Sequence, residues 1–316
     1  MNVTFLGTGA GMPSKNRNVT SILLDLRQEL NEFWMFDCGE ASQHQILHTT
    51  VSPRKINKIF ITHLHGDHIF GLPGFLSSRA FQAGREPVFI YGPKGIREFV
   101  ETSLEISGTR LSYSIYFKEL EEGLIFEDSK FKVYCKKLDH GITSYGFRME
   151  EKDLPGRLLV DRLKKDNILP GPVYQQIKEN DFVTLPSGEE IDTSPYIDKP
   201  RKGRVIVLFG DTRYNEEHIA FAQNATLLIH EATFSKEQGQ LARDYFHSTT
   251  IQAAHLAKEA RVKRLIITHI SARFHKSESN QLLQEAQSVF TNTQIANDLD
   301  EFLIKTTEVH QGNQKD

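Results

Sequence analysis

The most constraining feature of the chain is a run of potential metal ligands directly after an apolar, strand-like segment. Residues 58–62 read Lys-Ile-Phe-Ile-Thr, and His63, His65, Asp67 and His68 follow them. On an extended backbone His63 and His65 point to the same side, because side chains alternate with a period of two. A glycine then lets the chain turn, so that Asp67 and His68 can offer a second pair of ligands nearby. Imidazole nitrogens and carboxylate oxygens suit divalent ions such as Zn²⁺, and ligands split two and two indicate a pair of metals.

The composition is that of a globular protein, with 39% hydrophobic and 25% charged residues among 316. No apolar stretch approaches the roughly 20 residues that span a bilayer, and we find no secretory signal at the N-terminus. The two cysteines, Cys38 and Cys135, cannot form a disulfide framework. We therefore expect a cytoplasmic protein with no membrane association and no disulfide-linked partner. The net charge of -3 gives no general attraction to nucleic acid, although a local basic patch can still hold phosphates.

Short apolar runs alternate with amphipathic segments, which predicts an α/β protein with stacked layers. Strands are expected over residues 3–6, 21–26, 33–36, 58–62, 88–91, 131–135, 204–209, 226–229 and 264–268. Helices are expected over residues 41–48, 68–81, 95–106, 216–223, 236–245, 249–260 and 280–290.

Residues 150–202 differ from the rest of the chain. The segment is charged, it contains few apolar residues that could form a core, and only residues 158–165 look helical. It is interrupted by Pro155, Pro170, Pro172, Pro186, Pro195 and Pro200. A loop of this length inside a compact domain is uncommon unless it has its own role. We predict one domain over residues 1–316 with a flexible arm inserted at 150–202; a tolerated insertion without a role is the alternative. The polar residues 305–316 are expected to fray.

Further potential ligands stand just after other predicted strands. His140 follows the strand at 131–135 within a few residues, Asp211 follows the strand at 204–209, and His269 directly follows the strand at 264–268. Adjacent strands end at the same edge of a sheet, so these positions can converge in space. Isolated residues of this kind are usually structural, but their shared placement predicts that they join the ligand run after residue 62.

The combined ligand set resembles the metallo-β-lactamase superfamily, whose fold is a four-layer αββα sandwich with two metals at one sheet edge. The set consists of His63, His65, Asp67, His68, His140, Asp211 and His269. Asp37, in the run Phe-Asp-Cys-Gly-Glu, resembles the first motif of that superfamily, an aspartate that supports the ligands from behind. The resemblance covers nearly the whole chain.

Other motifs resemble the ribonuclease Z family of tRNA 3′-processing endonucleases. Residues 13–18 read Pro-Ser-Lys-Asn-Arg-Asn, similar to the family's Pro-x-Lys-x-Arg-Asn loop. Residues 230–233, His-Glu-Ala-Thr, and residues 247–249, His-Ser-Thr, resemble two further motifs. Residues 169–174, Leu-Pro-Gly-Pro-Val-Tyr, resemble part of the arm that grips the tRNA elbow in this family.

The resemblance implies a division of the ligands between two Zn²⁺ ions per subunit. One ion would be bound by His63, His65 and His140, the other by Asp67, His68 and His269, with Asp211 as the bridge. Such a pair can activate a water molecule and neutralise charge on a phosphate. Asp67 would also accept the proton of the attacking water, although another base is possible.

Roles follow for residues around the metals. His247, oriented by Glu231, would protonate or hold the departing oxygen; alternatively, His247 only neighbours a helix cap at Ser248. Contacts to the substrate would come from Lys15, Arg17, Asn18, Ser271 and Arg273. A solvated loop is the alternative for Lys15 and Arg17.

The implied function is that of a zinc-dependent endoribonuclease that removes the 3′ trailer from precursor tRNA. It would cut 3′ of the discriminator nucleotide, leaving a 3′-hydroxyl on the tRNA and a 5′-phosphate on the trailer. The family also implies a homodimer in which the arm of one subunit serves the active site of the other. A dizinc hydrolase acting on small phosphodiesters or other esters would share the ligands, but it would not need the loop at 13–18 or the arm. A non-catalytic RNA-binding protein is disfavoured, because no candidate ligand is missing.

Overall fold

The chain divides into two compact units in this computed structural model, which describes residues 1–305. The larger unit comprises Met1–Glu151 and Arg204–Lys305, and the smaller comprises Lys152–Gly203. Apart from Lys305, the C-terminal stretch expected to fray lies outside the described residues.

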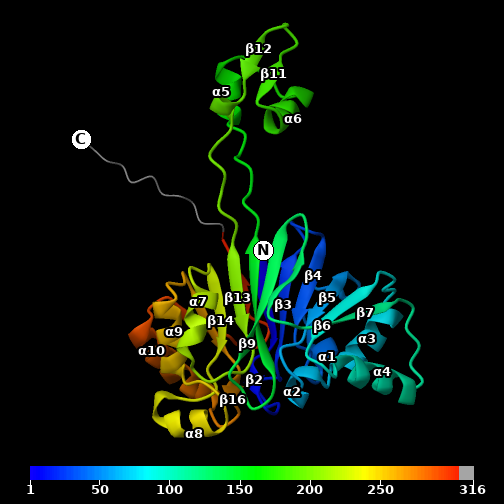
Figure 1. Ribbon diagram of the computed structural model, residues 1–316, viewed down its shortest axis with the longest axis vertical. Helices are drawn as coiled ribbons and strands as arrows, with labels where there is room; N and C mark the ends of the chain where they lie inside the picture. Colours follow the sequence, from blue (N-terminus) through cyan, green and yellow to red (C-terminus); the bar gives the residue numbers. More distant parts are fainter. Residues whose placement is uncertain (306–316) are drawn as a thin grey trace. The chain divides into compact units, whose positions relative to one another are not determined.

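The larger unit contains two seven-stranded sheets (Figure 1). The order in the first sheet is β18 (Glu301–Leu303), β1 (Asn2–Gly7), β3 (Ser21–Leu26), β4 (Glu32–Phe36), β5 (Ile56–Phe60), β6 (Val88–Gly92) and β7 (Ile115–Glu119). The order in the second is β17 (Thr293–Ile295), β15 (Leu265–Thr268), β14 (Leu227–Glu231), β13 (Val205–Phe209), β10 (Ser144–Glu151), β9 (Phe131–Leu138) and β8 (Gly123–Glu127). Two short strands, β2 (Gly9–Ala10) and β16 (Ile270–Ser271), pair in parallel.

Each sheet carries helices on one face (Figure 1). The helical elements on the first sheet's side are α1 (Ser42–Ile46), η1 (Pro53–Lys55), α2 (Gly66–Ile69), α3 (Leu72–Phe81) and α4 (Ile96–Ile106). Those on the second sheet's side are η3 (Glu216–His218), α7 (Ile219–Ala222), η4 (Lys236–Gln238), α8 (Gly239–Asp244), α9 (Thr250–Glu259), η5 (Lys276–Glu278) and α10 (Ser279–Val289).

The two sheets face each other across a core of aromatic and aliphatic side chains drawn from both. Phe60 of β5 stacks on Phe36 of β4 with 4.9 Å between ring centroids, and it meets Phe147 of β10 edge-on at 5.4 Å. The contact between Phe60 and Phe147 joins the sheets directly, since β5 and β10 belong to different ones. The predicted αββα four-layer sandwich is therefore confirmed, and the sheet-to-sheet core fixes the distance between the strand ends that carry the candidate ligands.

Several local predictions differ from the structure. The helix expected over residues 68–81 is two helices, α2 and α3, with a break at Gly71. A Cβ at Gly71 would lie 1.9 Å from the carbonyl oxygen of Gly39, so only glycine allows this approach. The strand β10 was not expected at all. Its Tyr145, Phe147 and Met149 lie in the core between the sheets and alternate with Gly146, Arg148 and Glu150, a pattern that the sequence does show.

The smaller unit is more ordered than the charged, proline-rich sequence suggested. It contains α5 (Val160–Lys165), α6 (Pro172–Glu179), β11 (Phe182–Thr184), β12 (Glu190–Asp192) and η2 (Ser194–Tyr196). Leu163, Ile168, Ile177 and Val183 form a small buried cluster of its own. The single helix expected over residues 158–165 thus underestimated this unit, because its few apolar residues all meet in one place.

Cys38 and Cys135 are both buried and unpaired. Among residues 1–305, every helix is too short or too polar to cross a bilayer.

A buried ion pair joins the two chain segments of the larger unit, Met1–Glu151 and Arg204–Lys305. The Arg204 guanidinium donates from Nε to Oε2 of Glu151 at 2.7 Å and from Nη2 to Oε1 at 2.6 Å. Nη2 also lies 2.7 Å from Oε1 of Glu29. Burial alone would raise the pKa of Glu151, but the hydrogen bonds and charge of Arg204 lower it below the ordinary value.

We expect Arg204→Met to lower the free energy of unfolding by about 3 kcal/mol at pH 7, because it leaves a buried carboxylate unpaired. Since the folded-state pKa of Glu151 is lowered, the wild-type contribution is present above the ordinary carboxyl pKa and is lost as pH falls through the lowered value. Urea unfolding at pH 7 and in acid should show a gap between the two proteins that narrows in acid. Arg27→Met, which breaks an exposed pair with Asp25, should cost under about 1 kcal/mol; an equal cost would contradict the argument.

Candidate metal centre and active site

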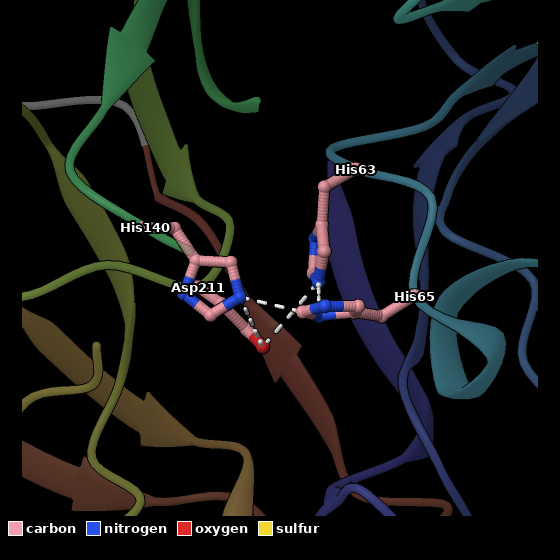
Figure 2. A group of neighbouring side chains, drawn as sticks. All are labelled: His63, His65, His140 and Asp211. Atoms are coloured by element: carbon pink, nitrogen blue, oxygen red, sulfur yellow. Dashed lines mark hydrogen bonds and ion pairs between the residues drawn. The ribbon is translucent and has the colours of Figure 1, made fainter. Parts of the chain in front are cut away.

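Asp211 lies at the centre of the candidate site, two residues past the end of β13. Its Oδ2 atom is 3.5 Å from Nε2 of His63 and 4.0 Å from Nε2 of His140. His65 completes this group, with Nδ1 at 3.0 Å from Nε2 of His63 and 3.2 Å from Nε2 of His140. Figure 2 shows His63 and His65 on one side, opposite His140 and Asp211 on the other. The two sheets thus contribute ligands from facing sides.

A second group of donors meets the same carboxylate. Oδ2 of Asp211 is 3.5 Å from Nε2 of His68 and 3.2 Å from Nε2 of His269. Oδ2 of Asp67 lies 3.5 Å from Nε2 of His68 and 4.0 Å from Nε2 of His269. One oxygen of Asp211 therefore stands between two sets of donors, the position of a bridging ligand.

The donor spacing fits tetrahedral metal sites. Four ligands at about 2.0–2.1 Å from a Zn²⁺ ion stand about 3.3–3.4 Å from one another, and the distances above cluster around that value. Within the described part of the chain, Nε2 of His68 is buried without a hydrogen-bond partner. A buried nitrogen left in this way needs a partner, and a metal ion is one that the neighbouring donors would share.

In four of the imidazoles the ring nitrogen that faces away from the centre contacts another group, and in three of them this group is a hydroxyl or a backbone carbonyl. Thr62 Oγ1 lies 2.9 Å from Nδ1 of His63, and Thr20 Oγ1 lies 2.8 Å from Nδ1 of His269. The carbonyl oxygen of Phe246 lies 2.8 Å from Nδ1 of His140. These contacts turn Nε2 of each ring toward the centre. The sequence analysis missed all three partners; only Thr62, next to the ligand run, had a signal that could have revealed it.

Asp37 orients the imidazole of His68 in the same way. Its Oδ2 atom accepts from Nδ1 of His68 at 2.8 Å and from Thr62 Oγ1 at 2.8 Å, and Oδ1 accepts from the Thr62 amide at 2.7 Å. Asp37 therefore lies behind the candidate ligands and not among them.

The electrostatics favour the protonation states that bind metal. Burial lowers the pKa of His63 well below its ordinary value and also lowers the pKa of His65 and His140, so these imidazoles are neutral near pH 7. Burial alone would raise the pKa of Asp211, but the surrounding imidazoles hold it well below the ordinary value. Burial likewise opposes protonation of His68, yet nearby carboxylates raise its pKa well above normal. A divalent ion at that point would take the place of the proton.

His247 and Glu231 form a buried pair beside the centre. Nδ1 of His247 lies 2.9 Å from Oε1 of Glu231 and 3.9 Å from Oδ2 of Asp211. Burial opposes protonation of His247, but Glu231 outweighs it and raises its pKa to about 9. Glu231 also accepts the amide hydrogens of Ser248 at 2.9 Å and Thr233 at 3.0 Å, so it is fixed in place. Because Nδ1 is engaged by Glu231, Nε2 is the nitrogen free to act on a substrate.

Asp67 is connected to the loop that follows β2. Its Oδ2 atom accepts the amide hydrogen of Gly11 at 2.7 Å. Gly11 has φ of +71°, a left-handed conformation that glycine adopts without strain. The carboxylate is therefore oriented by the same loop that leads into residues 13–18.

The structure places Arg17 in the interior instead of at the surface. The residue is 7% exposed, and Nη1 donates to Thr8 Oγ1 at 2.6 Å and to the carbonyl oxygen of Ala296 at 2.7 Å. Nη2 lies 3.1 Å from Oδ1 of Asn297. Asn18 is also engaged, with its side chain donating to the Glu40 carbonyl at 2.8 Å. Both residues hold the loop in place, and this differs from the substrate contact expected for them.

Lys15, Ser271 and Arg273 remain accessible. Lys15 and Arg273 are exposed and Ser271 is half-buried, with its Oγ accepting the Arg273 amide hydrogen at 3.4 Å. Pairing of β2 with β16 places the two segments side by side, and a hollow of about 110 Å³ is lined by residues of both, including Ser14 and Ser271.

A four-layer sandwich with this donor set at one edge of its sheets defines a metal-dependent hydrolase of the metallo-β-lactamase class. Residues 1–154 match the family model described as anti-Pycsar protein Apyc1. The metallo-β-lactamase fold protein YhfI from Bacillus subtilis has the same fold, with a TM-score of 0.67 at 21% identity over 95% of this chain and 98% of that one.

Closer relatives narrow the class. The chain is 57% identical over 304 residues to ribonuclease Z of Anoxybacillus flavithermus, covering 96% of this chain and 97% of the relative. It is 56% identical over 304 residues to ribonuclease Z of Listeria monocytogenes, covering 96% and 99%. Human tRNase Z, short form, superposes with a TM-score of 0.71 at 31% identity, over 96% of this chain and 100% of that one. The chain belongs to the ribonuclease Z family of endoribonucleases.

We expect Arg17→Met to lower the free energy of unfolding by about 2–4 kcal/mol, because it leaves several buried oxygens without a donor. Lys15→Met, two residues away and exposed, should leave stability unchanged and weaken substrate binding instead. Thermal unfolding and Michaelis–Menten kinetics on both variants would separate the two roles. Equal stability of both variants would contradict the buried placement of Arg17.

Proposed function

We propose that the chain is a zinc-dependent endoribonuclease that removes the 3′ trailer from precursor tRNA, cutting 3′ of the discriminator nucleotide. The observation that carries this proposal is the placement of Asp211 Oδ2 within 3.2–4.0 Å of the Nε2 atoms of four histidines, next to the His247–Glu231 pair. The relatives named ribonuclease Z and tRNase Z supply the class of substrate. A tRNA substrate implies that the protein works in the cytoplasm.

Two Zn²⁺ ions per subunit are the proposed cofactors, one for each set of donors, with Asp211 shared. Nitrogen-rich donor sets with carboxylate oxygens suit Zn²⁺. When bound, the ions would neutralise charge at the scissile phosphate and make a water molecule acidic enough to attack near neutral pH.

The protein's own groups would move the protons. Asp67, aimed at the ligand cluster by the Gly11 amide, would accept the proton of the attacking water. His247 would give a proton from Nε2 to the 3′-oxygen as its bond to phosphorus breaks. Glu231 keeps that imidazole oriented and protonated. The tRNA then leaves with a 3′-hydroxyl, and the trailer keeps the 5′-phosphate.

Accessible cations near the centre would position the RNA. Arg273 and Ser271 would bind the scissile phosphate, and Lys15 would contact nucleotides beyond the cleavage point. Arg17 and Asn18 would keep the loop of Lys15 in place from below, since their polar groups are already bonded within the protein.

The unit Lys152–Gly203 is the proposed arm for the tRNA elbow, carried by the single metallo-β-lactamase-fold domain. Base-paired RNA is recognised through shape and backbone, so a small folded unit can bind the tRNA without reading its sequence. We propose that the protein is a homodimer in which each arm serves the partner's active site.

Incubation with a tRNA precursor should release one trailer whose 5′ end maps to the nucleotide after the discriminator. A chelator should abolish cleavage and Zn²⁺ should restore it. Asp67→Ala should still bind the precursor but cut it at least about 100-fold more slowly, and His247→Ala should lose about 100-fold in kcat. Precursor left whole by a protein that splits bis(p-nitrophenyl) phosphate would instead favour a small-phosphodiester hydrolase.

Replacement of residues 152–203 by a short turn tests the arm. Glu150 pairs with Val205 across β10 and β13, so such a turn can join the two strands without disturbing the sheet. This variant should hydrolyse bis(p-nitrophenyl) phosphate normally but fail on precursor tRNA.

Mixing the arm-less variant with Asp67→Ala, after dissociation and reassembly, should recover about a quarter of wild-type cleavage, because mixed dimers of two-fold symmetry hold one complete site. Mass spectrometry would show whether mixed dimers form. If they form and stay inactive, the arm acts within its own subunit.

A further inference from the structure

Arg213 lies beside the candidate metal centre without belonging to it. Its guanidinium donates to both carboxylate oxygens of Asp139, from Nη2 to Oδ1 at 2.9 Å and from Nε to Oδ2 at 3.2 Å. Its amide also donates to the carbonyl oxygen of Asp139 at 2.8 Å. Asp139 precedes the ligand His140, and Arg213 follows the ligand Asp211 by two residues. The pair therefore fastens together two loops that each carry a ligand.

The other face of Arg213 covers an aromatic ring. Its guanidinium carbon is 4.4 Å from the ring centroid of Phe246. Gly141 approaches the same ring, since a Cβ there would lie 3.6 Å from Cδ2 of Phe246. Phe246 has φ of +59°, a left-handed conformation that is unfavourable for a bulky residue. Such a backbone persists only where its surroundings hold it, and the packing of Phe246 against Arg213 and Gly141 provides that support.

The strained residue has a function at the centre. Its carbonyl oxygen accepts from Nδ1 of His140 at 2.8 Å, which leaves Nε2 to face Asp211. The next residue is His247, whose Nδ1 donates to Glu231. A single stretch of backbone, residues 246–247, thus orients one metal ligand and carries the proposed proton donor.

We propose that Arg213 is a positioning residue for the cleavage reaction. By pairing with Asp139 and packing on Phe246, it holds residues 139–140 and 246–247 in the relative placement that aims His140 at the metals and His247 at the departing oxygen. This inference rests on the proposed function. A direct grip on RNA phosphate is the competing role for an arginine here, but two of its donors are already bonded to Asp139, which also neutralises its charge.

The test uses the full-length dimeric protein with Arg213→Gln, Arg213→Lys, Asp139→Asn and the double variant Arg213→Gln/Asp139→Asn. With precursor tRNA, Arg213→Gln should lower kcat about tenfold, the size typical of partners that orient metal ligands, and leave KM unchanged. The lysine variant should fall between it and wild type, since lysine keeps the charge but not the two-point contact. The double variant should be no worse than Arg213→Gln, because both changes break one interaction.

Arg243→Gln is the matched control, because it removes an exposed arginine from the helix just before Phe246 and should behave as wild type. An increase in KM with unchanged kcat in Arg213→Gln would overturn the proposal and assign Arg213 to RNA binding. Wild-type kcat together with wild-type metal affinity would overturn it as well.

Two measurements do not depend on tRNA cleavage. Competition with a chelating dye should show about tenfold weaker Zn²⁺ binding by Arg213→Gln, and NMR of labelled histidines should show loss of the Nδ1 proton signal of His140. If wild-type protein fails to cut precursor tRNA, the proposed function falls while these readouts still decide the role of Arg213. If Arg213→Gln is unfolded by circular dichroism, Arg213→Lys and Asp139→Asn carry the same comparison.

Discussion

The buried carboxylate of Asp211 among four imidazoles is the interaction on which the rest of the site depends. Its ligand neighbours come from both sheets, because His63 and His68 follow β5 while His269 follows β15. They meet only if the two sheets pack face to face at one distance, and the aromatic contacts between β5 and β10 set that distance. The hydrophobic core is thus also what holds the proposed metal centre together.

The orientation of the candidate ligands is set by the groups behind them. Hydroxyl, carboxylate and carbonyl oxygens select which ring nitrogen faces the centre. Asp67 and His247 are oriented in the same way, Asp67 by the Gly11 amide and His247 by Glu231. An acidic chain can therefore act on RNA, because charge at the scissile phosphate is met locally and not by the protein's overall field.

Much of the architecture could be predicted because the relevant signals are local. Apolar runs followed by ligand residues located β5, β13 and β15, and the ligand set indicated the sandwich. The strand β10 was not predicted, although Tyr145, Phe147 and Met149 alternate with Gly146, Arg148 and Glu150. The burial of Arg17 could not be predicted: its polar neighbours are typical of a solvated loop, whereas its acceptor at Ala296 is 279 positions away. No window of sequence around Arg17 contains that information.

Residue order alone was enough to name the ligand types and their grouping after strands, since these depend on side-chain chemistry and backbone periodicity. The resemblance to a known family came from the motifs themselves. The tertiary structure decided which nitrogen each imidazole turns inward, that Arg17 is an internal anchor, and that Phe246 serves the site through its carbonyl. A backbone oxygen is the same in every residue, so its use can be recognised only when the fold brings a particular one to a particular ring.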